Sequence, residues 1–172
     1  MRNLINPFYF KRGAKSRIGK YARLDILPNH HFAMGAASVI EDFSIINNGL
    51  GDVQIGAHVF IGASNVIIGP VAIDDHVMTA QHVVFSGMNH GIKDGTVPYR
   101  YQPCTVEQIT VGEGSWIGAN AVILPGVQIG RFCVIAAGSV VSRNVPEYHM
   151  AAGNPAVLIK QLDRENGIWK KI

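Results

Sequence analysis

The chain lacks any apolar run that approaches the length of a membrane-spanning helix. One of its longest apolar runs, residues 134–141, is interrupted by glycine and serine, whereas a spanning helix needs about 20 mostly apolar residues. The first seven residues, MRNLINP, also lack the apolar core of a secretory signal peptide. We therefore expect a cytoplasmic protein without an integral membrane segment.

Cysteine is scarce, and its two positions, Cys104 and Cys133, have no spacing typical of a metal site. In a reducing cytoplasm these side chains are expected to be free thiols rather than a disulfide. The sequence therefore predicts neither a disulfide-stapled fold nor a bound metal.

Acidic residues are missing from the start of the chain, where none appears before Asp25. Seven of the fifteen Lys and Arg residues precede that position, although the net charge is only +3. One interpretation is a solvated basic segment, and the other is contact with an anionic surface, such as a membrane that carries a lipid-linked glycan. No nucleic-acid partner is expected.

What the chain does contain is aliphatic residues and glycine. Of its 172 residues, 48% are apolar, only 8% are aromatic and 19 are glycine. The apolar set is mainly Ile, Val and Ala, which favours a β-rich repeat with many turns over a helical bundle. The length suits a single domain, residues 1–172.

Large aliphatic residues recur every six positions in two runs, which start at Ile55 and Val111. Ten of the twelve positions are Ile or Val, and the residues that follow are often Gly or Ala. The twelve are Ile55, Ile61, Ile67, Ile73, Thr79, Phe85, Val111, Ile117, Ile123, Ile129, Ile135 and Val141. A period of six fits neither a helix nor one long strand. It does fit short strands joined by tight bends and stacked into coils, each of which buries the open face of its neighbour.

Small side chains or valine stand four residues after most of these positions, where the bends are crowded. Cys133 occupies one of them, so we interpret it as a packing residue.

Outside the two runs the period weakens. Residues 1–17 are expected to be a lead-in segment and residues 18–154 the β-helix, with irregular first coils over residues 18–52. Ile18 and Leu24 are six apart there, as are Val39 and Ile45. Residues 155–172 carry Leu158, Ile159, Leu162 and Trp169 among charges, which predicts a C-terminal helix covering the last coil.

The period also breaks between Phe85 and Val111, which are separated by 26 residues. The intervening segment is rich in turn-forming and polar residues, so it predicts a loop extruded from the coil over about residues 91–108. Loops of this kind often carry functional residues.

Five short segments resemble the hexapeptide-repeat acetyltransferases, which include sugar, polysaccharide and streptogramin acetyltransferases. They are residues 86–90 (SGMNH), 116–120 (WIGAN), 123–127 (ILPGV), 136–141 (AAGSVV) and 152–156 (AGNPA). The resemblance implies a left-handed parallel β-helix, a homotrimer with active sites in clefts between neighbouring coils, and acetyl-CoA as co-substrate with no permanently bound cofactor. It implies transfer to a hydroxyl of a sugar or of a cell-surface polysaccharide precursor.

His90 falls on the catalytic histidine of this family. A neutral imidazole can remove a proton from a hydroxyl during attack on a thioester and return it to the leaving sulfur. Asn89 beside it is expected either to bond the substrate or to shape the bend.

The resemblance also carries over acetyl-CoA contacts. The corresponding residues are Trp116, Ala119, Ala137, Ser142, Arg143 and, as a weaker candidate, Lys160. The tryptophan matches one beside the pantetheine channel, and the two alanines match positions where backbone groups bond pantetheine amides. Ser142 and Arg143 match a pair near the CoA phosphates, where a guanidinium suits phosphate geometry.

Acceptor-binding residues carry over poorly, and Asp94, Tyr99 and Gln102 in the loop are the candidates. The acceptor could instead be an antibiotic hydroxyl, as in the streptogramin enzymes, or the amine of an amino-sugar.

Two other classes of function stay open. A γ-type carbonic anhydrase shares the fold and would need three histidines around zinc. His58, His76 and His82 each lie three residues after a repeat position and would stack on one face, although their spacing differs from the pattern of that family. A non-catalytic β-helix that binds an acyl-CoA or a protein partner is the other alternative.

Overall fold

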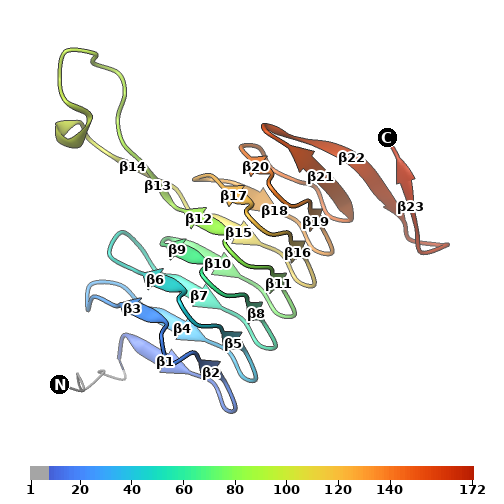
Figure 1. Cartoon of the computed structure of the whole chain (residues 1–172), viewed down its shortest axis with the longest axis horizontal. Coiled ribbons are helices and arrows are strands. Elements are labelled where there is room, and N and C mark those ends of the chain that lie inside the picture. The colour runs from blue at the N-terminus through green and yellow to red at the C-terminus, as the bar shows by residue number, and fades with distance from the viewer. Residues whose placement is uncertain (1–7) are drawn as a thin grey trace.

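The computed structural model describes residues 8–172, which form a three-sided parallel β-helix (Figure 1). Each coil contributes one strand to each of three parallel sheets, called sheets A, B and C here. Six such coils stack along the axis within the described residues. The stacked coils are those that the six-residue period predicted, and the architecture is the left-handed parallel β-helix that the resemblance implied.

The strands of the three sheets are short. Sheet A contains β1 (Phe10–Arg12), β4 (Phe32–Met34), β7 (Val53–Ile55), β10 (Val71–Ile73), β15 (Ile109–Val111) and β18 (Gln128–Ile129). Sheet B begins with β2 (Arg17–Ile18), β5 (Val39–Ile40), β8 (Phe60–Ile61), β11 (Met78–Thr79), β16 (Trp116–Ile117) and β19 (Val134–Ile135). Sheet C contains β3 (Arg23–Asp25), β6 (Ile45–Asn47), β9 (Val66–Ile68), β12 (Val84–Ser86), β17 (Val122–Ile123) and β20 (Val140–Val141).

The core lies inside the prism. All twelve positions of the two regular runs are at most 3% exposed, which confirms that the large aliphatic residues point inward. The small position is confirmed as well: Cys133 is a buried free thiol, and burial raises its pKa. The buried hydroxyl of Ser115 donates to the Gly130 carbonyl at 2.8 Å and accepts the Cys133 N–H at 2.9 Å. The buried hydroxyl at this bend is therefore satisfied by the next coil.

The β-helix begins earlier than the predicted residue 18, because β1 pairs with β4 inside the predicted lead-in segment. Its first coils pair in full register, but they are longer. Ile18 pairs with Ile40 and Ile40 with Ile61, steps of 22 and 21 residues, whereas Ile61 pairs with Thr79 after 18. The extra residues form longer turns between sheets C and A, and these turns hid the period.

The predicted pair Val39 and Ile45 was wrong by one residue. The inward side chains are those of Ile40 and Ile46, which are both fully buried, while Val39 and Ile45 point outward and are only half-buried. A shift of one residue along a strand exchanges the two faces of a sheet. The prediction therefore put inside the second coil the two residues that lie on its outer surface.

The predicted extruded loop is confirmed. It leaves the coil after β12 through β13 (Met88–Asn89) and returns through β14 (Thr105–Val106), and these two strands pair antiparallel. A single-turn 3-10 helix, η1 (Tyr99–Tyr101), lies on the limb that returns to β14, and the loop projects far from the coil stack (Figure 1). Within residues 8–172, no helix has the length and hydropathy needed to cross a bilayer.

The predicted C-terminal helix is wrong, because residues 156–171 form strands. β21 (His149–Gly153) joins sheet B parallel to β19, and β22 (Ala156–Asp163) and β23 (Ile168–Lys171) continue the sheet antiparallel. The backbone groups at the edge of β21 find hydrogen-bond partners in β22, which a helix lying there would not provide. Figure 1 shows this ribbon extending sheet B beyond the last coil.

Candidate active site

His90 and Asn89 lie where the chain leaves the coil stack for the loop. Asn89 ends β13, where it pairs with Thr105 of β14. The side chains of Asn89 and His90 are both exposed. They border a cavity of about 750 Å³ at the base of the loop. The cavity is lined by Asn89, His90, Gly91, Ile92, Lys93, Tyr99, Arg100 and Thr105. The structure thus brings together His90, Asn89 and Tyr99 from the predicted set.

Cys104 is a neighbour of His90 that the sequence did not indicate. Its Sγ lies 3.4 Å from Nδ1 of His90, and the thiol is free and exposed. The two residues are 14 positions apart, and only the antiparallel pairing of β13 with β14 brings them together. That register depends on how the loop closes, so no local sequence signal identifies the contact.

The loop is held together by Gln102, which is only 8% exposed. Its side-chain amide donates to the carbonyls of Asp94 and Val97 at 2.7 and 2.9 Å, and its carbonyl oxygen accepts the Asp94 N–H at 3.3 Å. Of the three predicted acceptor residues, Gln102 therefore lies inside the loop, whereas Tyr99 lines the cavity.

The Asp94 side chain forms hydrogen bonds within its own turn. Its carboxylate accepts both the hydroxyl and the backbone N–H of Thr96, at 2.7 and 2.8 Å. These bonds, the side-chain bond first, hold the pKa of Asp94 below its usual value. In this conformation the carboxylate is an exposed turn residue outside the cavity lining.

We expect Gln102→Ala to loosen the loop without unfolding the β-helix. The substitution removes three hydrogen bonds to the backbone of Asp94 and Val97, at a net cost of about 0.5–1.5 kcal/mol each, because both residues are exposed. Hydrogen exchange measured by mass spectrometry should be faster over residues 91–104 and unchanged over residues 109–141. Gln108→Ala, at an exposed position between β14 and β15, is the matched control. Equal exchange in both variants would contradict a structural role for Gln102.

Two of the predicted acetyl-CoA residues share one row on the outer face of sheet B. Trp116 is 47% exposed and stands beside Met78 on one side and Val134 on the other. The same row continues through Met150 to Lys160 on β22. Neighbouring strands are about 4.8 Å apart, so Trp116 and Lys160 are roughly 14 Å apart across the sheet.

Ala119 and Ala137 lie at the corner between sheets B and C, in successive coils. The Gly138 N–H donates to the Ala119 carbonyl at 2.8 Å. A Cβ on neighbouring Gly118 would lie 2.6 Å from the backbone nitrogen of Ala137, so the coils approach closely here and require glycine. Small side chains leave the backbone of this corner accessible.

Ser142 and Arg143 lie away from the other predicted acetyl-CoA residues. They follow β20, so they lie at the opposite edge of sheet C, and both are exposed. Within one chain, the predicted acetyl-CoA residues therefore fall into two groups separated by the outer face of sheet C.

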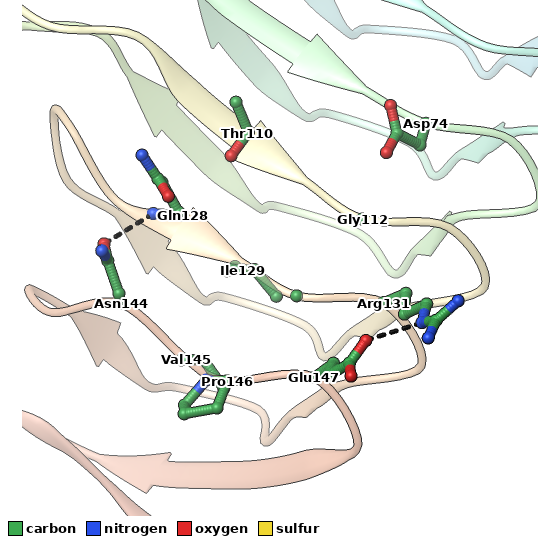
Figure 2. A pocket seen from close by; sticks show the side chains of 11 residues that line it. Asp74, Thr110, Gly112, Gln128, Ile129, Arg131, Asn144, Val145, Pro146 and Glu147 are labelled. Carbon is green, nitrogen blue, oxygen red and sulfur yellow. Dashed lines mark hydrogen bonds and ion pairs between the residues drawn. The ribbon is translucent and has the colours of Figure 1, made fainter.

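A second cavity, of about 450 Å³, lies on the outer face of sheet A and is lined by none of the predicted residues (Figure 2). Arg131 pairs with Glu147 across it, and the Asn144 side chain accepts the backbone N–H of Gln128 at 2.9 Å. The ion pair raises the pKa of Arg131. Its one lining cation, Arg131, is already paired with Glu147, which makes this cavity a weaker candidate than the one beside His90.

The predicted histidine row is wrong in one member. His58 and His76 stack at the corner between sheets A and B with 5.0 Å between ring centroids. His82 lies at the following corner, because it comes three residues after a position in sheet B rather than sheet A. Among residues 8–172, no three His, Cys, Asp or Glu side chains converge on a point where a metal ion could be held.

Comparison with known proteins places these features in a family context. Residues 108–143 match the family model described as bacterial transferase hexapeptide (six repeats). A protein of Mycobacterium tuberculosis named as an acetyltransferase is 30% identical over 160 residues, 91% of this chain and 53% of that protein. An Escherichia coli protein named for O-acetyl transfer in lipopolysaccharide biosynthesis is 30% identical over 127 residues, 70% of this chain. The chain spans only 53% and 63% of the lengths of these two relatives.

Solved structures share the fold. A variant of the N-acyltransferase AntD from Bacillus cereus, bound to dTDP-4-amino-4,6-dideoxyglucose and coenzyme A, superposes with a TM-score of 0.77 at 22% identity, covering 91% of this chain and 86% of that one. A maltose O-acetyltransferase from Clostridium difficile superposes with a TM-score of 0.58 at 24% identity, covering 88% and 69%. At these identities the likeness concerns the fold alone.

Proposed function

Because the chain belongs to the hexapeptide-repeat acetyltransferase superfamily, we propose that it is a cytoplasmic acetyl-CoA-dependent O-acetyltransferase with His90 as general base. The acceptor is a hydroxyl of a sugar or of a cell-surface polysaccharide precursor. The observation that carries the proposal is the position of His90, exposed beside a cavity of about 750 Å³ at the base of the extruded loop. The E. coli relative named for O-acetyl transfer favours a hydroxyl acceptor over an amine.

The proposed reaction is direct transfer. The acceptor oxygen attacks the thioester carbonyl carbon, the C–O bond forms and the C–S bond breaks. Nε2 of His90 takes the hydroxyl proton during attack and gives it to the departing CoA sulfur. Neither a covalent enzyme intermediate nor a metal takes part. Asn89, next to the base, is proposed to bond the acceptor.

Cys104 is proposed to fix the tautomer of His90. With Nδ1 protonated and its hydrogen directed at the sulfur 3.4 Å away, the lone pair of Nε2 is available as the base. The thiol is thus a positioning residue, and its role is one that the sequence did not indicate.

A homotrimer is proposed because the outer faces of two sheets are apolar. The row on sheet B comprises Val39, Phe60, Met78, Trp116, Val134 and Met150. The row on sheet C comprises Ile45, Val66, Val84, Val122 and Val140. Two different apolar faces on one chain suit a closed ring with head-to-tail contacts. Such a ring would also bring Trp116 of one copy toward His90 of the next, since the two lie on different faces of one chain.

The cavity contributes two cations to acceptor binding. Lys93 and Arg100 both line it, and the acids nearest to them in sequence, Asp94 and Glu107, do not. We infer that an acceptor with a phosphate or carboxylate is preferred over a neutral sugar, because the cations would be left without partners otherwise.

The test is calorimetric titration with acetyl-CoA. We expect binding in the micromolar range, weakened about 10-fold by Trp116→Ala and by Arg143→Ala, since each removes about 1–2 kcal/mol of stacking or phosphate contact. The matched controls are Phe60→Ala, from the same outward row two coils earlier, and Arg17→Ala on the first coil. Light scattering on the same samples should give three chains per particle.

Failure has a clear signature in this experiment. If folded, trimeric protein binds no acetyl-CoA, the acetyltransferase proposal is wrong. If Phe60→Ala weakens binding as much as Trp116→Ala, the effect comes from the assembly rather than from a CoA contact.

A further inference from the structure

Positive charge is concentrated on the first coil, residues 8–31, which forms the N-terminal end of the coil stack (Figure 1). This coil carries six Lys and Arg residues and one acid, a net charge of +5. Residues 32–126, which form the next coils and the loop, carry two basic residues and eight acids, a net charge of −6. Residues 127–172, at the other end, carry six basic residues and three acids, a net charge of +3. The middle of the stack is therefore acidic, and the first coil is the most positive part of the described chain.

The cations surround this end on every side. Lys11 lies on the outer face of sheet A, opposite Ala33, and Arg17 on that of sheet B, opposite Val39. Arg23 lies on the outer face of sheet C, opposite Ile45. Lys15 and Lys20 occupy the two corners between these strands, and both are exposed. The result is a ring of cations around the terminal coil, which we call the basic ring.

Most of the basic ring is not neutralised by the protein. Arg17 pairs with Glu41 at 3.1 Å and Arg23 with Asp25 at 2.9 Å. Within the part of the chain that the structure describes, Lys11, Lys15 and Lys20 have no acidic side chain within ion-pair distance. These three ammonium groups are available to an external anion.

Large apolar side chains are exposed at the same end. Tyr21 and Phe43 stack at the corner between sheets B and C, with centroids 5.6 Å apart and exposures of 58% and 64%. Lys20 lies over the Tyr21 ring at 5.2 Å. Leu27 and Leu50 are 49% and 40% exposed on the turns between sheets C and A. Tyr21 and Phe43 thus form one exposed aromatic pair beside the basic ring, whereas the two leucines lie at a different corner.

We propose that this end of the β-helix docks on an anionic lipid bilayer, with the basic ring at the headgroups. Lys and Arg are attracted to the negative surface of a cytoplasmic leaflet. Aromatic residues such as Tyr21 and Phe43 favour the headgroup level, where one side of the ring is apolar and the other is wet. A nucleic acid is the poorer fit, because its phosphates are tracked by a groove or stripe of cations rather than by a ring.

Lys and Arg on a terminal coil also discourage edge-to-edge aggregation. That role alone accounts for the charges, and the proposed trimer would turn the Tyr21–Phe43 corner, which lies between its two apolar faces, toward the neighbouring copies. Bilayer docking accounts for both features.

The experiment is vesicle co-sedimentation with the full chain. Vesicles contain phosphatidylcholine alone or with 30% phosphatidylglycerol. Wild type should bind the anionic vesicles and not the neutral ones. Lys11→Gln/Lys15→Gln/Lys20→Gln should weaken partitioning about 100-fold, since each lysine near the surface contributes roughly fivefold. Arg164→Gln/Lys170→Gln/Lys171→Gln, at the opposite end of the stack, makes the same change in net charge and should bind like wild type.

A second variant tests the aromatic pair. Tyr21→Ala/Phe43→Ala should lose vesicle binding at physiological salt while keeping the binding of soluble heparin, because heparin offers charge without an apolar layer. Circular dichroism confirms that each variant is folded.

Several results would overturn the proposal. One is the absence of anionic-vesicle binding by wild type, and another is an equal loss in the two triple variants. Tighter binding of a double-stranded RNA oligonucleotide than of anionic vesicles would assign the basic ring to nucleic acid instead. Acetyl-CoA binding is independent of all these outcomes, so failure here leaves the proposed enzyme activity standing.

Discussion

His90→Ala should lower kcat by about 10²–10⁴-fold with the acceptor that a panel of hydroxyl- and amine-bearing sugars identifies. Removal of a positioned general base has effects of this size, because an unassisted hydroxyl is a poor nucleophile. Affinity for acetyl-CoA should change little, since the imidazole acts on the acceptor proton rather than on the CoA chain. CoA release is followed with a thiol reagent, and acetyl-CoA binding by calorimetry.

The matched control is His82→Ala in the same coil, at an exposed corner on the surface of the stack. Its kcat should stay within about twofold of wild type. If His90→Ala keeps a third or more of the wild-type kcat, as His82→Ala should, then His90 is not the base. Cys104, which touches it, would then be the first group to test. A lower kcat with unchanged acetyl-CoA affinity indicates a lost base, whereas a change in both indicates a collapsed loop.

Phe85→Ala should lower the free energy of unfolding by about 3–5 kcal/mol, the usual cost of truncating a fully buried phenylalanine. The ring is completely buried on β12 and lies between Ile67 of the coil below and Ile123 of the coil above. Its removal leaves a cavity in the coil from which the loop departs, five residues before His90. Urea unfolding at fixed protein concentration measures the loss, because assembly would make stability depend on concentration.

Phe43→Ala removes the same side chain from an exposed corner and should cost about 0.5 kcal/mol or less. Equal losses in the two variants would mean that Phe43 is covered in the assembled protein and that the two substitutions report on assembly rather than on the coil core. A loss below 1 kcal/mol for Phe85→Ala would contradict the packing of this coil.

The regular coils were predictable because their physical constraint is local and repeated. Every sixth side chain must be large and apolar to fill the prism, and the side chain at each bend must be small. The period can therefore be read directly from residues such as Ile61 and Ile117. The first two coils obey the same rule, but turns of extra residues between sheets C and A shift the count. Once the count is lost, strand alternation cannot decide between Val39 and Ile40.

The C-terminal segment shows the same limit in another form. Leu158, Ile159 and Leu162 have a spacing that suits a helical face, and nothing nearby forbids a helix. The segment forms β22 instead because β21 presents an unsatisfied edge to it. That edge exists only after β21 has joined β19. Their pairing joins residues 134–135 to residues 150–151, which are far apart in the sequence.

By itself, the sequence determined the stacked coils, their inward residues, the position of the extruded loop, and His90 as the candidate base at its foot. These follow from a short period, turn chemistry and motifs, all read within a few residues. Only the tertiary structure decided that Cys104 touches His90, that Gln102 holds the loop together, and that the basic residues of the first coil form a ring. Each of these depends on the register between segments far apart in the chain, and the pairing of backbone hydrogen bonds sets that register after the coils have stacked.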